Sequence, residues 1–230
     1  MPTRKHIIRI CATIIGISGL TILFSTLYPI ASYEWEAEQK FPSLLSPIVR
    51  DEKSVSLSDV DYTRASNWFP GATPKEDFTS SDVSYFTISI PKLDIENATV
   101  RVGGEDLAES LIQFPGTATP GKNGNTVIFG HSILPLFYNP ENYISIFSLL
   151  PSLKNGDEVN VNYDGVFYNF KVEAMFEVAP TDIQVLDQDT NDSFLTLVTC
   201  VPPGDPRKPK RLIVRARLVP FKEANANISD

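Results

Sequence analysis

The sequence predicts an all-β domain, either a barrel or a sandwich, preceded by one membrane-spanning helix near the N-terminus. From Tyr85 onward, short alternating or apolar runs are separated by Pro, Gly, Asn and Asp, a pattern typical of strands and turns. Upstream, the 23 residues from Ile10 to Ser32 carry no charge. As a helix they are long enough to cross about 30 Å of hydrocarbon.

Seven segments are predicted to be strands, and only short helices are expected between them. The predicted strands are 85–90, 98–102, 125–130, 158–163, 166–176, 194–200 and 211–219. The helices are expected over 105–112 and 144–150. Turn signals at Asn155-Gly156 and Asp164-Gly165 flank the fourth strand, and the second of them predicts a tight hairpin. Several short strands at this spacing indicate a barrel or a sandwich.

Four parts are predicted along the chain. Residues 1–33 are expected to form a cytoplasmic tip and the membrane helix, 34–84 an extracytoplasmic linker, 85–222 the β-rich domain and 223–230 a tail. The linker is rich in Ser, Asp, Thr and Pro over 51–84, which favours a tether that lifts the domain off the bilayer. The alternative is that Trp68 and Phe69, its one apolar island, dock on the domain as a strap.

Charges on the two sides of the uncharged run predict its orientation. They are Arg4, Lys5 and Arg9 before it and Glu34, Glu36 and Glu38 after it. The positive-inside rule then places the N-terminus in the cytoplasm and the domain outside the plasma membrane, on a single-pass anchor. A cleaved signal peptide is the alternative, although Tyr28-Pro29-Ile30 fits a small-residue cleavage site poorly. Both interpretations export the domain.

Net charge argues against a nucleic-acid partner. The formal net charge is −8, and the first 33 residues hold three of the 20 basic residues and none of the 28 acidic ones. The remainder is therefore near −11. Nucleic-acid binding usually requires a basic stripe, which this surplus of acid opposes.

Cysteine and histidine are scarce enough to focus attention on two residues. Cys11 lies in the membrane run, so Cys200 is expected to be a free thiol, and His131 is the only imidazole in the exported domain. Taken alone, Cys200 fits an inert buried side chain and His131 an ordinary structural histidine. Together they fit thiol catalysis, in which imidazole favours or uses the thiolate. Zinc is disfavoured for want of ligands, no cofactor is expected, and calcium activation is left open.

Both residues come at the ends of predicted strands. Thr196–Cys200 runs straight into Val201-Pro202-Pro203, and a second apolar strand ends at Gly130-His131. In the last strand, alternation places Arg211, Arg215 and Arg217 on one face. Each arginine fits a solvated charge, but Arg211 opens its strand nearest the loop after Cys200. A guanidinium there could donate hydrogen bonds to a carbonyl oxygen or a developing oxyanion.

These motifs resemble those of the sortase family. The matching segments are TLVTC at 196–200, KRLIVRA at 210–216, GNTVIFGHS at 124–132, IPKLDI at 90–95, FPGTA at 114–118 and VAPTD at 178–182. The resemblance covers roughly 86–220, and several ordered motifs at family spacing carry it.

The resemblance implies an eight-stranded β-barrel with one or two short helices. It also implies cleavage of an LPXTG-like sorting signal between Thr and Gly and transfer of the acyl group to an amino nucleophile on a cell-wall precursor or pilin. In this role Cys200 is the nucleophile, His131 the acid and then the base, and Arg211 the stabiliser of substrate and oxyanion. The candidate substrate contacts are Thr199, Pro202, Pro203 and Ser132, although Thr199 faces away from Cys200, which favours packing.

An anchoring sortase of class D or E type is favoured over a pilin polymerase of class C, because residues 51–84 show no obvious aspartate-aromatic lid motif. Two other functions stay open. A papain-type thiol hydrolase also uses Cys and His, but there the cysteine comes first and begins a helix, whereas His131 precedes Cys200 by 69 residues. The non-enzymatic alternative is a membrane-tethered barrel that binds peptide without turnover.

Overall fold

Eight strands close into a barrel in the computed structural model, which describes residues 4–42, 61–69, 72, 83–188 and 191–220. The strands are β1 (Tyr85–Ile90), β2 (Ile95–Val102), β3 (Leu111–Gln113), β4 (Gly124–Phe129), β5 (Glu158–Tyr163), β6 (Val166–Val178), β7 (Ser193–Val201) and β8 (Lys210–Leu218). Their order around the barrel is β1-β2-β3-β4-β7-β8-β6-β5. The all-β prediction and the eight-stranded barrel implied by the family resemblance are both confirmed.

Two pairs of neighbouring strands, β2–β3 and β4–β7, run parallel, and the other pairs are antiparallel. The interior is filled by alternate apolar side chains, as the period of two along a strand requires. On β8 these are Leu212, Val214 and Ala216, so Arg211, Arg215 and Arg217 share the outer face as the alternation predicts. The short 3-10 turns among the described residues are η2 (Ala65–Asn67), η4 (Pro91–Leu93), η5 (Pro135–Phe137), η6 (Leu150–Ser152) and η7 (Ile183–Leu186).

Both helices predicted within the domain are wrong. Residues 105–110 form turns that lead into β3, to which 111 and 112 already belong, and 144–149 form turns that lead into η6. In the first case the backbone is engaged elsewhere, because the amide of Leu107 donates to Thr63 O at 3.0 Å and Glu105 O accepts from the amide of Ala65 at 3.0 Å. The carbonyl of Glu105 would have accepted the first bond of a helix over 105–112, and the amide of Leu107 would have had no partner inside that helix, so both groups are satisfied by segment 61–69 instead.

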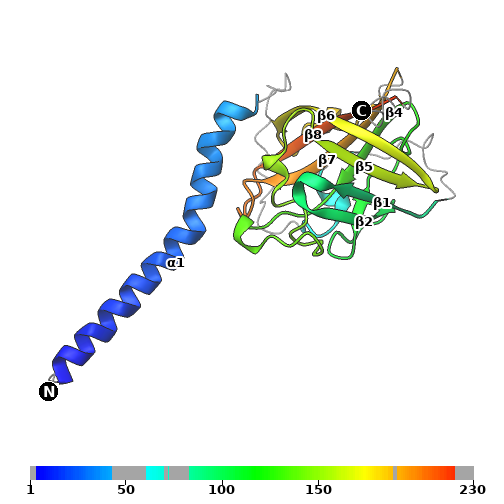
Figure 1. Ribbon diagram of the computed structural model, residues 1–230. Coiled ribbons are helices and arrows are strands. Elements are labelled where there is room, and N and C mark those ends of the chain that lie inside the picture. Colours follow the sequence, from blue (N-terminus) through cyan, green and yellow to red (C-terminus); the bar gives the residue numbers. More distant parts are fainter. Residues whose placement is uncertain (1–3, 43–60, 70–71, 73–82, 189–190, 221–230) are drawn as a thin grey trace, which may run out of the picture.

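Helix α1 (Arg4–Lys40) extends the predicted membrane helix by two turns beyond residue 33. It is long and apolar enough to cross a membrane, and it lies to one side of the barrel (Figure 1). Its C-terminal part contacts the barrel. Tyr33 donates a 2.7 Å hydrogen bond to buried Glu177, and Lys210 is 2.9 Å from Glu177 and 3.3 Å from Glu34.

Gly130, which follows β4, is required by close packing. A Cβ at this position would lie 2.6 Å from Leu111 Cδ2 and still closer to the ring of Phe147. Both neighbours are fully buried, so neither side chain can swing into solvent. The chain therefore passes between two core side chains at the point where it delivers His131.

Gly130→Ala is expected to lower the free energy of unfolding by about 1–3 kcal/mol, the usual cost of inserting a methyl group into a packed core. Urea unfolding of the detergent-solubilised chain would measure it. Gly16→Ala is the control, because a Cβ there meets nothing within 4 Å. Equal stabilities of the two variants would contradict the close-packing argument.

Candidate active site

The thiol of Cys200 and the guanidinium of Arg211 are neighbours across the β7–β8 ladder. The two residues are direct partners in the register, and both side chains lie on the outer face of the barrel. Cys200 is 2% exposed and Arg211 fully buried. The NH1 group of Arg211 donates to the carbonyls of Lys208 at 2.9 Å and Lys210 at 3.2 Å. The connection from β7 to β8 therefore holds the guanidinium beside the thiol.

His131 reaches the same place from the other side of β7. Strand β4 runs parallel to β7, and the amide of Gly130 continues the ladder by donating to Val198 O at 3.1 Å. His131 is the next residue, and its own carbonyl accepts from the amide of Phe147 at 3.0 Å. The structure thus brings Cys200, His131 and Arg211 together at one end of three adjacent strands, as their positions in the sequence predict.

Two hydroxyl groups tie the ends of β4 and β7 to each other. The Thr199 hydroxyl donates to Gly130 O at 2.8 Å, and the Ser132 hydroxyl donates to Cys200 O at 2.6 Å. Thr199 is fully buried and Ser132 is 6% exposed. These bonds bracket His131 and Cys200, so each residue is held through its neighbours. The Thr199 side chain is directed away from Cys200 and into the barrel, the direction from which a packing role was expected.

Segment 61–69, here called the strap, lies across the three residues. Trp68 is fully buried, with its ring stacked 5.3 Å from that of Phe129 and 5.9 Å from the imidazole of His131. Phe69 packs on the same Phe129 ring at 5.8 Å. The linker is therefore more than a tether at residues 61–69, and the alternative that Trp68 and Phe69 dock as a strap is confirmed. Most of 43–82 outside the strap lies beyond the described residues.

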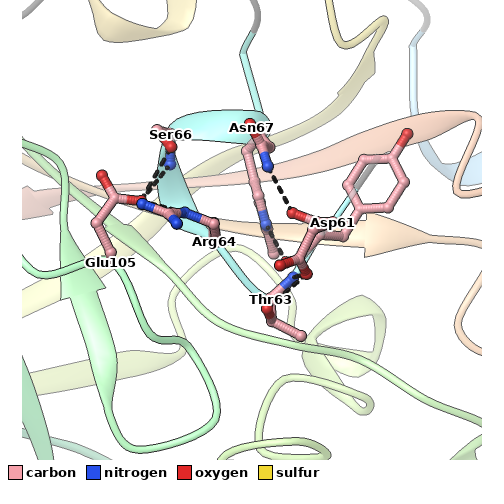
Figure 2. Close-up of polar contacts among 8 residues, drawn as sticks. Asp61, Thr63, Arg64, Ser66, Asn67 and Glu105 are labelled. Carbon is pink, nitrogen blue, oxygen red and sulfur yellow. Dashed lines mark hydrogen bonds and ion pairs between the residues drawn. The ribbon is translucent and has the colours of Figure 1, made fainter. Parts of the chain in front are cut away.

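Polar contacts shape the strap and fasten it to the barrel (Figure 2). The amide and hydroxyl of Ser66 donate to Glu105 Oε2 at 3.3 and 2.9 Å. Within the strap, Asn67 Nδ2 donates to Asp61 O at 2.7 Å, and Trp68 Nε1 donates to Tyr62 O at 2.9 Å. The buried indole thus has a hydrogen-bond partner, which its burial requires.

The strap also contacts the guanidinium of Arg211 through a hydrogen bond and two aromatic rings. The NH2 group donates to Trp68 O at 3.3 Å, and the guanidinium carbon lies 5.3 Å from the Tyr62 ring and 5.5 Å from the Trp68 ring. Arg211 Nε has no hydrogen-bond partner among the described residues. A backbone carbonyl of the chain itself therefore sits where a peptide substrate would present one to the guanidinium.

Burial favours the uncharged form of both reacting groups, which share a buried cluster or a ring contact with Trp68. It raises the pKa of the Cys200 thiol, an effect that the positive charges of Arg211 and Lys208 oppose. It also lowers the pKa of His131 to about 4; Lys208 adds to this shift, and Asp106 and Asp61 oppose it. A freed imidazole would take up its proton near pH 6.5, so docking of the strap weakens as the pH falls below that value.

The other predicted site residues lie close by. Pro202 and Pro203 are buried in the connection that follows Cys200, and their contact with substrate, like that of Thr199 and Ser132, stays a prediction. Tyr62 was missed, although the apolar island at Trp68-Phe69 is a signal that could have drawn attention to its neighbourhood. Within the part of the chain that the structure describes, no group of three His, Cys, Asp or Glu is placed to hold a metal ion.

Comparisons with known proteins agree with this barrel. The sequence profile of the sortase domain matches residues 88–219, more than half of the chain. The chain belongs to the sortase family. Among curated proteins, Sortase A of Bacillus anthracis is 30% identical over 140 residues, which are 59% of this chain and 60% of that protein. The chain spans about half to three fifths of the length of the curated relatives that it matches.

Solved structures of two sortase subclasses resemble the chain about equally. Sortase D5 of Clostridium perfringens has a TM-score of 0.51 at 25% identity, covering 63% of this chain and 84% of that one. Sortase C-1 of Actinomyces oris has a TM-score of 0.52 at 26% identity, covering 61% and 77%. The subclass therefore stays open.

Thr199→Val is expected to lower kcat for peptide cleavage about tenfold or more, because a small displacement of His131 relative to Cys200 costs reactivity. It should also cost about 1–3 kcal/mol of stability, since Gly130 O loses its buried donor. Peptide-cleavage kinetics and urea unfolding would measure the two effects. Thr199→Ser keeps the hydroxyl and should behave nearly as wild type; a defect of equal size in Thr199→Ser would show that the hydrogen bond is not the cause.

Trp68→Ala is expected to speed alkylation of Cys200 by iodoacetamide and to move its pH midpoint downward. Exposure removes the burial that raises the thiol pKa while Arg211 still favours the thiolate, and each unit of pKa changes the thiolate fraction about tenfold. Mass spectrometry at several pH values distinguishes Cys200 from Cys11. Trp35→Ala is the control, because Trp35 lies 74% exposed on α1. Unchanged alkylation in Trp68→Ala would contradict a protective strap.

Proposed function

We propose that this chain is a membrane-anchored cysteine transpeptidase that cleaves an LPXTG-like sorting signal between Thr and Gly. It then transfers the acyl group to an amino nucleophile on a cell-wall precursor or a pilin. The observation that carries the proposal is the convergence of Cys200, His131 and Arg211 on the ends of β7, β4 and β8. A thiol, an imidazole and a fixed guanidinium are the groups that acyl transfer through a thioester needs.

The reaction begins when the strap leaves and a peptide takes its place. The thiolate of Cys200 attacks the threonine carbonyl carbon, and negative charge develops on the carbonyl oxygen. Arg211 stabilises that oxygen with the NH2 group that otherwise donates to Trp68 O. Because its other amino group is already held by the carbonyl of Lys208 in the loop and that of Lys210 at the start of β8, the guanidinium needs little reorganisation.

His131 handles the protons of both half-reactions. As the tetrahedral intermediate collapses, the C–N bond breaks and His131 donates a proton to the leaving amine, which leaves a thioester on Cys200. The incoming amine then attacks the thioester, His131 accepts its proton, and the Cys200 thiolate is released. Because Trp68 moves away from the imidazole before this cycle, the pKa of His131 returns toward its ordinary value. Both protonation states of His131 then become accessible near neutral pH.

Helix α1 supplies the anchor in this proposal. It crosses the plasma membrane once, with the basic residues before Ile10 in the cytoplasm and the barrel outside. No cofactor is proposed. The acceptor is to be identified by supplying the enzyme with glycine oligomers, lipid-linked precursor analogues or a pilin lysine peptide as the amine. The amine found in the transfer product identifies the class of acceptor.

Cys200→Ala is expected to abolish both cleavage of a quenched LPXTG-type peptide and transfer to an added amine. Arg211→Lys should lower kcat about 10²- to 10³-fold, because a fork of donors beside the oxyanion becomes a single ammonium group. Arg217→Lys is the matched control, since Arg217 shares the strand and face but its side chain is 55% exposed and paired with Glu173. Cleavage by Cys200→Ala at the wild-type rate would refute Cys200 as the nucleophile, whereas binding of the peptide by the wild-type chain with no cleavage would favour a binding domain.

A further inference from the structure

The connection between β4 and β5 presents two large apolar side chains to solvent. Leu136 and Phe137 are 70% and 60% exposed, and both belong to η5. The turn is closed by backbone bonds, from the amide of Phe137 to Leu134 O at 2.9 Å and from the amide of Tyr138 to Pro135 O at 3.1 Å. The turn therefore holds the two side chains outward in a defined conformation. We call this pair the apolar tip.

Contacts on both sides prevent the apolar tip from folding back on the barrel. The Tyr138 hydroxyl donates to Leu93 O. On the other side, Leu134 lies against the backbone of Gly204 in the β7–β8 connection, where a Cβ would come within 2.6 Å of Leu134 Cγ. The tip thus belongs to the end of the barrel at which β7 ends and β8 begins.

Helix α1 contacts this same end of the barrel. Lys210, the first residue of β8, is paired with Glu34, and Tyr33 is hydrogen-bonded to Glu177 near the end of β6. One face of the helix is partly or fully buried toward its C-terminal end. The residues on this face are Thr26, Pro29, Ile30, Tyr33, Ala37 and, directly after the helix, Phe41. The uncharged run ends at Ser32, so contact with the barrel occurs where the helix would leave the hydrocarbon.

Figure 1 shows which end of the barrel lies on the side of α1. The connections at the end of β7 and the start of β8 lie on the side of α1, whereas the hairpin between β5 and β6 points away from it. The barrel is thus held with one specific end next to the membrane-spanning part of the helix. Phe167, 71% exposed near the start of β6, marks the opposite end.

We propose that Leu136 and Phe137 insert into the outer leaflet of the bilayer that α1 spans, as a second membrane contact of the catalytic domain. The inference rests on the anchoring part of the proposed function and not on the chemistry. Two exposed apolar side chains gain by leaving water. The helix contact at Tyr33 and Glu34 holds their end of the barrel at the level of the bilayer surface. Two contacts fix the tilt of the barrel, so the Cys200 end faces the membrane.

The test uses the full chain in phosphatidylcholine nanodiscs that each hold one copy. Phe137→Cys is labelled with the fluorophore NBD in a Cys11→Ala, Cys200→Ala background. We expect blue-shifted emission and quenching by lipids that carry a shallow nitroxide, because an interfacial side chain is buried about 5–10 Å deep. Phe167→Cys is the matched control, and quenching at 137 should exceed that at 167 about twofold or more. Leu136→Cys provides an independent reporter.

Each alternative outcome overturns the proposal in a recognisable way. NBD on the native Cys11, in a Cys200→Ala chain, reports insertion of α1 itself. If Cys11 is quenched but positions 136 and 137 resemble 167, the tip does not touch the bilayer while the anchor stands. If Cys11 is unquenched, the anchor fails and the inference fails with it. A signal at 137 that appears only with two copies in one nanodisc assigns the tip to a second chain.

Discussion

The site depends on the position of β7 between a parallel and an antiparallel neighbour. Pairing with β4 brings His131 to the end of β7, and pairing with β8 places Arg211 directly opposite Cys200. A slip of one residue in either ladder would turn a required side chain to the opposite face, since side chains alternate along a strand. The Thr199 and Ser132 hydroxyls oppose such a slip because both bonds cross from β7 to β4.

A buried guanidinium with an incomplete set of partners is the second constraint. Arg211 is fully covered and keeps its charge, so its donors have to be satisfied by carbonyl groups. The loop supplies two of these groups and the strap supplies the third through Trp68 O. This explains how a segment far upstream in the sequence finds the site. It offers the guanidinium a carbonyl, and it offers the Phe129 ring an aromatic surface. The same burial disfavours the thiolate of Cys200 and the imidazolium of His131, so the site is less reactive while the strap is docked.

Several features were predictable because they depend on residues near one another in the chain. Alternation along 211–218 correctly separated the arginine face from the core face, and Asp164-Gly165 correctly marked the hairpin between β5 and β6. The helix predicted over 105–112 failed for a tertiary reason. Its apolar spacing fits a helix, but the amide of Leu107 and the carbonyl of Glu105 are bonded to the strap, a partner that no local pattern reveals.

The sequence by itself determined the fold class, the apolar helix and the candidate nucleophile and imidazole. Strand periodicity, an uncharged run and the scarcity of Cys and His are all local or compositional properties. Only the tertiary structure decided that Thr199 and Ser132 tie two strands together and that Trp68 packs on His131 while its carbonyl accepts a hydrogen bond from Arg211. Each of these depends on contacts between residues that lie more than 60 positions apart in the sequence and on the order of strands around the barrel. Such contacts form only when the whole barrel closes. The reacting residues could therefore be predicted from the sequence, whereas the packing of the strap against them could not.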